Sequence, residues 1–323
     1  MNNVAIGVDV GGTKVLAVAL GDDGEVIDVE RLDTPRGDET IAGDATAGVV
    51  ASVIATLVAR NDWSLDDVVV GVGLPGMMTR EGILAFAPNL PSASGADLAS
   101  GVRRRLASLR ILCENDADCA VVAEHRLGAA RGLDDVVMVT LGTGIGGGII
   151  SGGVLVRGRS GFAGEIGHMV LDAHGPQCPC GSRGCWERYA SGAGVTRLTH
   201  EAAAAGRLPL LVKRHGSIDA VRGEDCTNAA SEGLVEALNV INEVGWWLAL
   251  GIANLAAILD TGTFIIGGGL STASALLLPA AQRHLVDLVE GGKARPPIAL
   301  LASAFAERSG AIGAALLARE RLT

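Results

Sequence analysis

Two stretches of this chain, far apart in the sequence, share one pattern of strand, glycine turn and strand. They are VDVGGTKV at residues 8–15 and VTLGTGIGGGI at residues 139–149. Apolar, β-branched runs on both sides of a tight glycine turn predict a pair of neighbouring strands. The repeat therefore predicts a duplicated α/β unit, with a cleft between the two copies.

The segments around these turns complete an α/β pattern. Strand-like runs cover residues 4–8, 15–20, 26–32, 67–72, 111–114, 136–141, 149–156 and 264–266. Helical spacing covers residues 42–60, 96–109, 231–259 and 309–319, and the segment ENDADCAVVAEHRLGAA opens another helix at its acidic end. No low-complexity linker separates the two copies, and we expect their boundary near residues 116–120.

Charge and hydropathy argue against two classes of partner. The 323 residues carry 26 Lys and Arg against 36 Asp and Glu, a net charge of −10, whereas a nucleic-acid surface needs a basic stripe. We find no basic amphipathic helix for a membrane surface. The first residues lack a basic leader, and the apolar stretch 246–259 is short and contains Asn254. We therefore expect a cytoplasmic protein with reduced cysteines and no nucleic-acid or membrane partner.

The two glycine turns have the chemistry of phosphate sites. Neither is a P-loop or a dinucleotide motif, because Thr13 separates the glycines from Lys14 and a strand, not a helix, follows each turn. Glycines let backbone N–H groups converge on an anion, Thr13 and Thr143 add hydroxyl donors, and Asp9 is placed to hold Mg²⁺ directly or through water. Ordinary hairpin turns are the alternative, and a third glycine cluster at residues 265–269 favours the phosphate hypothesis.

A cluster of cysteine and histidine between residues 168 and 185 fits a metal site. Its spacing is H-x9-C-x-C-x4-C, formed by His168, Cys178, Cys180 and Cys185. Three thiolates and an imidazole suit tetrahedral zinc, and a full set of four ligands makes the site structural, with no open position for water. Gly181 and Gly184 allow the loop to fold around the ion. His174 is a rival fourth ligand, and unrelated reduced cysteines are the alternative.

Three further acidic segments are candidates for substrate chemistry. Glu165 and Glu187 flank the cysteine cluster, and two carboxylates fixed by a metal would suit the vicinal hydroxyls of a sugar. Solvated surface charge is the alternative for both. In ENDADC, Asp116 could accept a hydroxyl proton beside a transferred phosphate, whereas a helix-capping role for Asn115 or Asp116 is the alternative.

With these residues in view, the whole chain resembles the ROK family of sugar kinases and related repressors, and within it the bacterial ATP-dependent glucokinases. The motifs that carry the resemblance are DVGGTK at 9–14, GLPG at 73–76, NL at 89–90, END at 114–116, GTGIGGG at 142–148 and GEIGH…CPCGSRGCWE at 164–187. The last motif looks like the family signature, which is highly specific.

The resemblance implies an α/β, actin-like, hexokinase-type (ribonuclease H-like) fold with two α/β domains flanking a cleft. A smaller N-terminal domain would span residues 1–117, with the helix at 309–323 packing back on it, and a larger domain would span residues 118–308, with a zinc-binding loop at 165–187. The resemblance implies a sugar substrate, ATP with Mg²⁺ and a structural Zn²⁺. It also implies assembly with further copies of the chain, as a homodimer or a homotetramer.

The resemblance also implies a role for each matched residue. Asp116 would be the base that deprotonates the sugar 6-hydroxyl. The sugar would be bound by Asn89, Asn115, Asp116, Glu165, His168 and Glu187. The nucleotide and its Mg²⁺ would be bound by Asp9, Gly11, Gly12, Thr13, Lys14, Thr143, Gly144, Gly268 and Gly269. The zinc ligands would be His168, Cys178, Cys180 and Cys185.

The chain departs from the family pattern at three places. Asp118 stands where the family usually has Asn, the segment PSASGAD at 91–97 replaces a Trp that many glucokinases carry after the NL motif, and Asp260 is not followed by the usual Pro. The first two bear on the acceptor. We expect transfer of the ATP γ-phosphoryl group to O6 of glucose, and another hexose, an amino sugar or a cyclitol is the alternative acceptor.

Two hypotheses from other classes are weaker. A non-catalytic, sugar-sensing ROK regulator would need a helix-turn-helix ahead of a phosphate motif that here begins at residue 9. An actin- or chaperone-like ATPase would have no use for the zinc signature or for Glu165 and Glu187.

Overall fold

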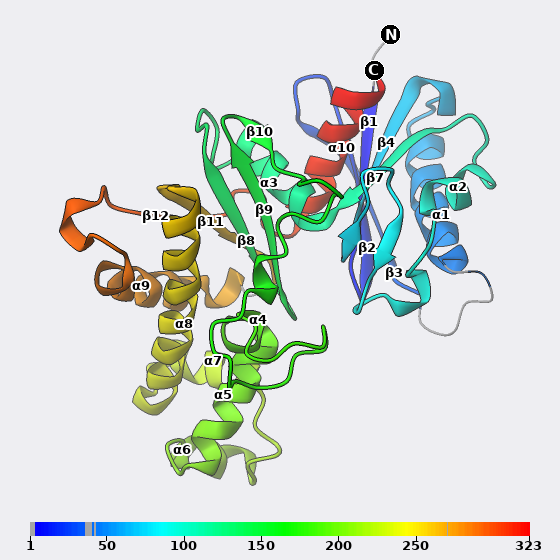
Figure 1. Ribbon diagram of the computed structural model, residues 1–323. Helices are drawn as coiled ribbons and strands as arrows, with labels where there is room; N and C mark the ends of the chain where they lie inside the picture. Colours follow the sequence, from blue (N-terminus) through cyan, green and yellow to red (C-terminus); the bar gives the residue numbers. More distant parts are fainter. Residues whose placement is uncertain (1–3, 36–40, 42, 270) are drawn as a thin grey trace. The chain divides into compact units, whose positions relative to one another are not determined.

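The computed structural model describes residues 4–35, 41, 43–269 and 271–323 of the chain (Figure 1). These residues form two compact units. Unit 1 comprises Met1–Met138, Gly148–Gly164 and Ser303–Thr323, and unit 2 comprises Val139–Gly147 and Glu165–Ala302. The predicted division of the chain at residue 117 stays a prediction.

The first sheet is built around the first glycine turn. Its strands are β1 (Val4–Val10), β2 (Lys14–Leu20), β3 (Val26–Asp33), β4 (Val68–Leu74) and β7 (Arg110–Asn115), in the order β3-β2-β1-β4-β7. The hairpins β1–β2 and β2–β3 are antiparallel, and β1, β4 and β7 run parallel. The carboxyl ends of these three parallel strands therefore lie at one edge, where ligand-binding loops gather in α/β folds.

Different helices cover the two faces of this sheet (Figure 1). Ile6 and Val8 of β1 pack in one apolar cluster with α1 (Asp44–Arg60) and α2 (Leu98–Arg103). Gly7 points to the opposite face, because side chains alternate along a strand. A Cβ on Gly7 or on Gly71 of β4 would overlap main-chain oxygens of α10 (Ser309–Leu322), so α10 lies directly on the sheet. α3 (Asp116–Arg126) packs beside α10, and a Cβ on Gly313 would overlap the Cys119 carbonyl oxygen.

The second sheet repeats the order of the first. Its strands are β8 (Val136–Leu141), β9 (Ile145–Ser151), β10 (Val154–Leu155), β11 (Thr263–Gly267) and β12 (Ala299–Ala302), in the order β10-β9-β8-β11-β12. The glycine-turn hairpin β8–β9 occupies the place that β1–β2 holds in the first sheet. The predicted duplication of an α/β unit is therefore confirmed.

The helices of unit 2 form a second core around one long helix. They are α4 (Glu187–Ala190), α5 (Gly192–Ala204), α6 (Pro209–His215), α7 (Gly223–Ser231), α8 (Val235–Leu259) and α9 (Ser271–Leu288). Among the described residues, α8 is the one helix long and apolar enough to cross a membrane, and 56% of its apolar window is buried inside the protein. The buried Trp186 lies against Gly251 of α8 and donates its indole N–H to the Trp247 carbonyl at 2.9 Å. These contacts fit the buried helix that the sequence predicts.

Three predicted elements need correction. The helix expected at 96–109 is confined to α2, with turns after it. The strand expected at 149–156 is a hairpin, because Gly152 and Gly153 both adopt positive φ between β9 and β10. The helix expected at 231–259 starts at Val235, after a separate α7. The helix expected at 42–60 is α1 from Asp44 onward, and Ala42 lies outside the described residues.

Candidate functional site

The first glycine turn is closed by hydrogen bonds that leave its outer face open. Gly11 N–H donates to the Lys14 carbonyl at 2.8 Å, and the Thr34 hydroxyl donates to the Gly11 carbonyl at 2.6 Å. Gly12 and Thr13 are exposed, and a Cβ on Gly12 would lie 3.6 Å from the Asn89 carbonyl oxygen. The turn and the Asn89 loop of unit 1 are therefore neighbours, as a site built from both requires.

Asp9 stands between this turn and the start of α10. A Cβ on Gly310 would lie 2.8 Å from the Asp9 carboxyl carbon, so the carboxylate packs against the first turn of α10. Burial raises the pKa of Asp9 to about 6, against the lowering effect of Lys14. A nearby cation would stabilise the charged form of this buried carboxylate. Asp9 therefore has the chemistry of a group that binds Mg²⁺ directly or through the water molecules around the ion.

Asn115 and Asp116 begin α3 at the carboxyl end of β7. Asn115 caps the helix, because its Oδ1 accepts from the N–H groups of Ala117 and Asp118 at 2.9 and 3.0 Å. Its Nδ2 donates to the Gly76 carbonyl at 3.0 Å, which ties the GLPG loop to the helix. Asp116 remains partly exposed, with Oδ1 2.8 Å from the Ala117 N–H. The capping role of Asn115 is therefore real, and it fixes the position of Asp116.

Behind Asp116 lies a buried group of charges. Asp118 is 1% exposed, and neither of its carboxyl oxygens has a hydrogen-bond partner within the described part of the chain. Burial, and then the charge of Glu114, raise the pKa of Asp118 to about 8, whereas Arg157 lowers it. Glu114 itself is fully buried, and its Oε2 lies 2.9 Å from both Arg157 Nε and Arg321 Nη1. Asp118 is thus a carboxyl group held in its neutral form around pH 7.

In unit 2, the second glycine turn is fixed from two sides. Gly142 N–H donates to the Gly144 carbonyl at 3.0 Å, and the N–H of Gly192, at the start of α5, donates to the Gly142 carbonyl at 2.8 Å. Gly268 adopts φ +93°, and a Cβ there would lie 2.5 Å from the Leu141 carbonyl oxygen. The second and third glycine clusters, which are 120 residues apart in sequence, therefore meet at the end of β8.

The cysteine cluster has the geometry of a metal site. One ligand atom each of His168, Cys178, Cys180 and Cys185 lies within 4.8 Å of the others. Cys180 and Cys185 Sγ atoms are 3.6 Å apart, and Cys178 Sγ is 3.8 Å from His168 Nδ1. Tetrahedral zinc with bonds of about 2.3 Å to sulfur separates its ligand atoms by about 3.8 Å. All six cysteines are free of disulfides. Of the two candidate histidines, His168 belongs to this group, and His174 is exposed.

The two predicted sugar-binding glutamates border this cluster. His168 Nε2 lies 3.9 Å from Glu165 Oε2, and its Nδ1 lies 4.0 Å from Glu187 Oε1. Cys178 Sγ donates to Glu187 Oε1 at 3.2 Å, and a Cβ on Gly144 would lie 2.5 Å from Glu187 Oε2. Burial raises the pKa of Glu165, with His168 opposing and Glu187 reinforcing the shift. The metal cluster, both glutamates and the second turn therefore form one contiguous site within unit 2.

The predicted residues thus fall into two groups. Unit 1 holds Asp9, Gly11, Gly12, Thr13, Lys14, Asn89, Asn115 and Asp116, and unit 2 holds the others. Sequence reasoning missed Glu307, which forms ion pairs with Lys14 and with Arg31, the latter at 2.9 Å. It also missed Gly310, and it quoted Glu114 within the END motif without giving it a role. The partners of Glu307, Gly310 and Glu114 could not be inferred locally, because they are distant in the sequence.

The ROK family profile matches residues 5–321, nearly the whole chain. The chain belongs to the ROK family. This ROK protein is 36% identical to a glucokinase of Streptomyces coelicolor, with 98% of both chains covered. It is 32% identical to an N-acetylmannosamine kinase of Shigella boydii, with 97% of this chain and 98% of that protein covered.

A solved structure gives the same result. The crystal structure of a Streptomyces griseus ROK glucokinase in complex with glucose and AMPPNP matches this ROK protein with a TM-score of 0.85 and 35% identity, over 98% of this chain and 100% of the other. The actin-like, hexokinase-type fold expected from the sequence is therefore confirmed.

Proposed function

We propose that this ROK protein is an ATP-dependent glucokinase, which transfers the γ-phosphoryl group of ATP to the 6-hydroxyl of glucose. The observation that carries the proposal is the likeness to the Streptomyces griseus glucokinase, which was solved with glucose and with AMPPNP, an analogue standing in for ATP. The 36% identity to a second glucokinase over almost the full length supports it.

Asp116 is the base in this proposal. Its carboxylate is partly exposed at the first position of α3, where the positive end of the helix dipole favours the ionised form that accepts a proton. Asn115 and the Gly76 carbonyl fix the backbone around it. Glu165, His168 and Glu187, together with Asn89 and Asn115, are proposed to hydrogen-bond the sugar hydroxyls. Phosphoryl transfer depends mainly on positioning, so this rigidity is what the reaction needs.

The nucleotide phosphates are proposed to bind at the two glycine turns. Exposed Gly12 and Thr13 offer backbone N–H groups and a hydroxyl, and Thr143 and Gly144, with Gly268 and Gly269, do the same in unit 2. Lys14 supplies a positive charge, and Asp9 fits the role of holding Mg²⁺. When bound, Mg²⁺ neutralises charge on the phosphates.

Zinc is proposed as a structural ion. The four ligand atoms of the cysteine cluster fit a closed tetrahedral site, and the set leaves no position for a catalytic water. The ion would stabilise the loop that carries Glu165, His168 and Glu187. A cytoplasmic location and a homodimeric or homotetrameric state stay predictions.

The first test is ADP production by the zinc-replete protein with ATP and Mg²⁺, with and without glucose. A large glucose-dependent rate is expected. Asp116→Asn is expected to lower kcat by about 10²–10⁴-fold, because general base catalysis contributes about that factor. Asp135→Asn, which changes an exposed carboxylate, is the matched control. Normal turnover by Asp116→Asn would refute the role of Asp116.

N-acetylmannosamine is the second acceptor to be measured in the same assay. The 32% identity to an N-acetylmannosamine kinase over 97% of the chain makes N-acetylmannosamine the alternative. A kcat/KM for N-acetylmannosamine above that for glucose would replace glucose as the acceptor and leave the kinase proposal intact.

A further inference from the structure

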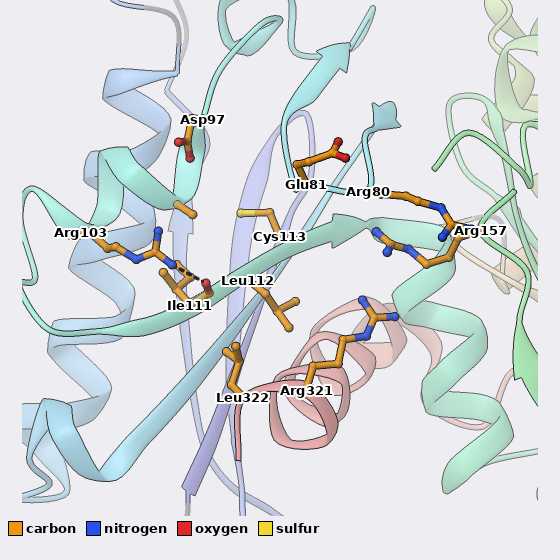
Figure 2. Close-up of a pocket in the computed structure, with 12 residues that line it drawn as sticks. Arg80, Glu81, Asp97, Arg103, Ile111, Leu112, Cys113, Arg157, Arg321 and Leu322 are labelled. Carbon is orange, nitrogen blue, oxygen red and sulfur yellow. Dashed lines mark hydrogen bonds between the residues drawn. The ribbon is translucent and has the colours of Figure 1, made fainter. Parts of the chain in front are cut away.

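Unit 1 contains a cavity that none of the proposed substrate or nucleotide residues lines. Its volume is about 390 Å³, within the range of small-molecule sites. It lies against β7, the edge strand of the first sheet, whose residues Ile111, Leu112 and Cys113 line it (Figure 2).

Four arginines line this cavity: Arg80, Arg103, Arg157 and Arg321. Only two carboxylates, Glu81 and Asp97, line it with them. The lining is therefore net positive, in a chain whose net charge is −10. The acidic composition of the chain does not explain this local positive charge, which favours the binding of an anion.

The arginines are not all needed to neutralise protein carboxylates. Arg157 and Arg321 share the single buried carboxylate of Glu114. Arg80 donates to the Gly158 carbonyl and Arg103 to the Ile111 carbonyl, and neither forms an ion pair within the described residues. Asp97 is engaged in capping α2, since its carboxylate accepts from the Ser100 N–H at 2.9 Å.

Three of the guanidinium groups gather at one end of the cavity. Arg157 and Arg321 meet at Glu114, and Arg80 is bound to Gly158, the residue after Arg157. Arg321 donates to Glu114 through Nη1, and its Nε and Nη2 have no hydrogen-bond partner in the part of the chain described. Arginine N–H groups in this fork arrangement match the oxygens of a phosphate group.

We propose that this cavity binds the phosphate group of a small phosphorylated molecule, at a site separate from the two glycine turns. Arg80, Arg157 and Arg321 hold the phosphate, and the apolar side chain of Leu112 contacts the remainder. The proposal goes beyond the proposed function and does not depend on it. Arg157 and Arg321 also form ion pairs with Glu114, which directly precedes Asn115 and Asp116. A phosphate bound by these arginines would therefore change the ion pairs of a residue next to the proposed base.

The test is isothermal titration calorimetry on the full zinc-replete chain, without glucose or ATP. The probes are inorganic phosphate and ribose 5-phosphate, with ribose as the uncharged control. Both phosphates are expected to bind, and tighter binding of ribose 5-phosphate would identify a phosphate monoester as the ligand class. Tighter binding of inorganic phosphate would overturn the phosphorylated-molecule assignment.

Variants separate this site from the glycine turns. Arg80→Gln removes an exposed arginine without leaving a buried carboxylate unpaired, and it is expected to weaken binding about tenfold. Arg159→Gln makes the same charge change at an exposed residue that does not line the cavity, and its affinity should match that of the parent protein. No binding at millimolar probe, or equal affinity in Arg80→Gln and Arg159→Gln, would overturn the proposal.

Discussion

Asp118 should make the stability of this protein depend on pH in a way that one substitution removes. Its pKa rises from 3.8 to about 8 on folding, chiefly because the side chain is buried at 1% exposure. Between these two pKa values the unfolded chain has lost the proton and the folded protein keeps it. The folded state therefore binds more protons, and Asp118 lowers the free energy of unfolding as pH rises.

The size of the effect follows from the shift. Each unit of pH between the two pKa values costs about 1.4 kcal/mol. From pH 5 to pH 8 the penalty of Asp118 therefore grows by about 3 kcal/mol. Asp118→Asn has nearly the same shape and no proton to lose. We expect it to gain about 3 kcal/mol relative to the parent protein over this range.

Urea unfolding followed by far-UV circular dichroism at pH 5, 6.5 and 8 measures this difference. Titration of histidines and cysteines affects the parent and Asp118→Asn alike, so it cancels. Asp135→Asn is the control, because hydrogen bonds from Ser151 and Gly152 lower the pKa of Asp135, the opposite direction to the shift of Asp118. A stability difference between the parent and Asp118→Asn that is constant from pH 5 to pH 8 would refute the reasoning.

Three further perturbations have definite outcomes. Cys185→Ser, or chelation of zinc from the parent protein, should lower Tm by several degrees and remove zinc measured by mass spectrometry, because a structural zinc site contributes directly to folding; an unchanged Tm after complete zinc loss would contradict the structural role. Gly313→Ala should destabilise by about 3 kcal/mol in urea unfolding, because its Cβ overlaps the Cys119 carbonyl, whereas Gly262→Ala, with open space around it, should cost little. Glu124→Ala should lower the free energy of unfolding by about 3–5 kcal/mol, because the substitution leaves several buried hydrogen-bond donors without an acceptor. The buried carboxylate accepts hydrogen bonds from the hydroxyls of Ser303 and Ser309 and from the N–H groups of Ala129, Ala304 and Phe305. Glu201→Ala at the surface is the control.

The local parts of the fold could be predicted from the sequence, because their signals are local. The turn at Gly11–Thr13 lies between two runs of β-branched residues, and β1 and β2 follow from that spacing. The four residues of the cysteine cluster lie within 18 positions, so their convergence needed only a loop. By contrast, the bounds of the separate helices α4–α7 and the hairpin at Gly152 and Gly153 depend on turns between short segments, which the sequence pattern did not indicate.

The long-range part of the site was not predictable in the same way. Glu307 lies 293 positions from Lys14, and nothing in its surroundings marks it as that residue's partner. The pairing of Glu114 with Arg157 and Arg321 likewise depends on where β7 and α10 meet. The sequence did mark Asp118 as a departure from the family pattern. Its burial and its neutral form at pH 7 required the packing of α3.

The packing of α10 on β1 sets a constraint on how the protein is made. Gly7 and Gly71 have no Cβ, which lets main-chain oxygens of α10 lie against them. This helix is translated some 240 to 300 residues later. Until residues 309–322 leave the ribosome, the first sheet lacks the helix that lies directly on Gly7 and Gly71. Unit 2 ends at Ala302 and needs no later segment. All residues of unit 2 are therefore synthesised before α10, and the first sheet is completed last.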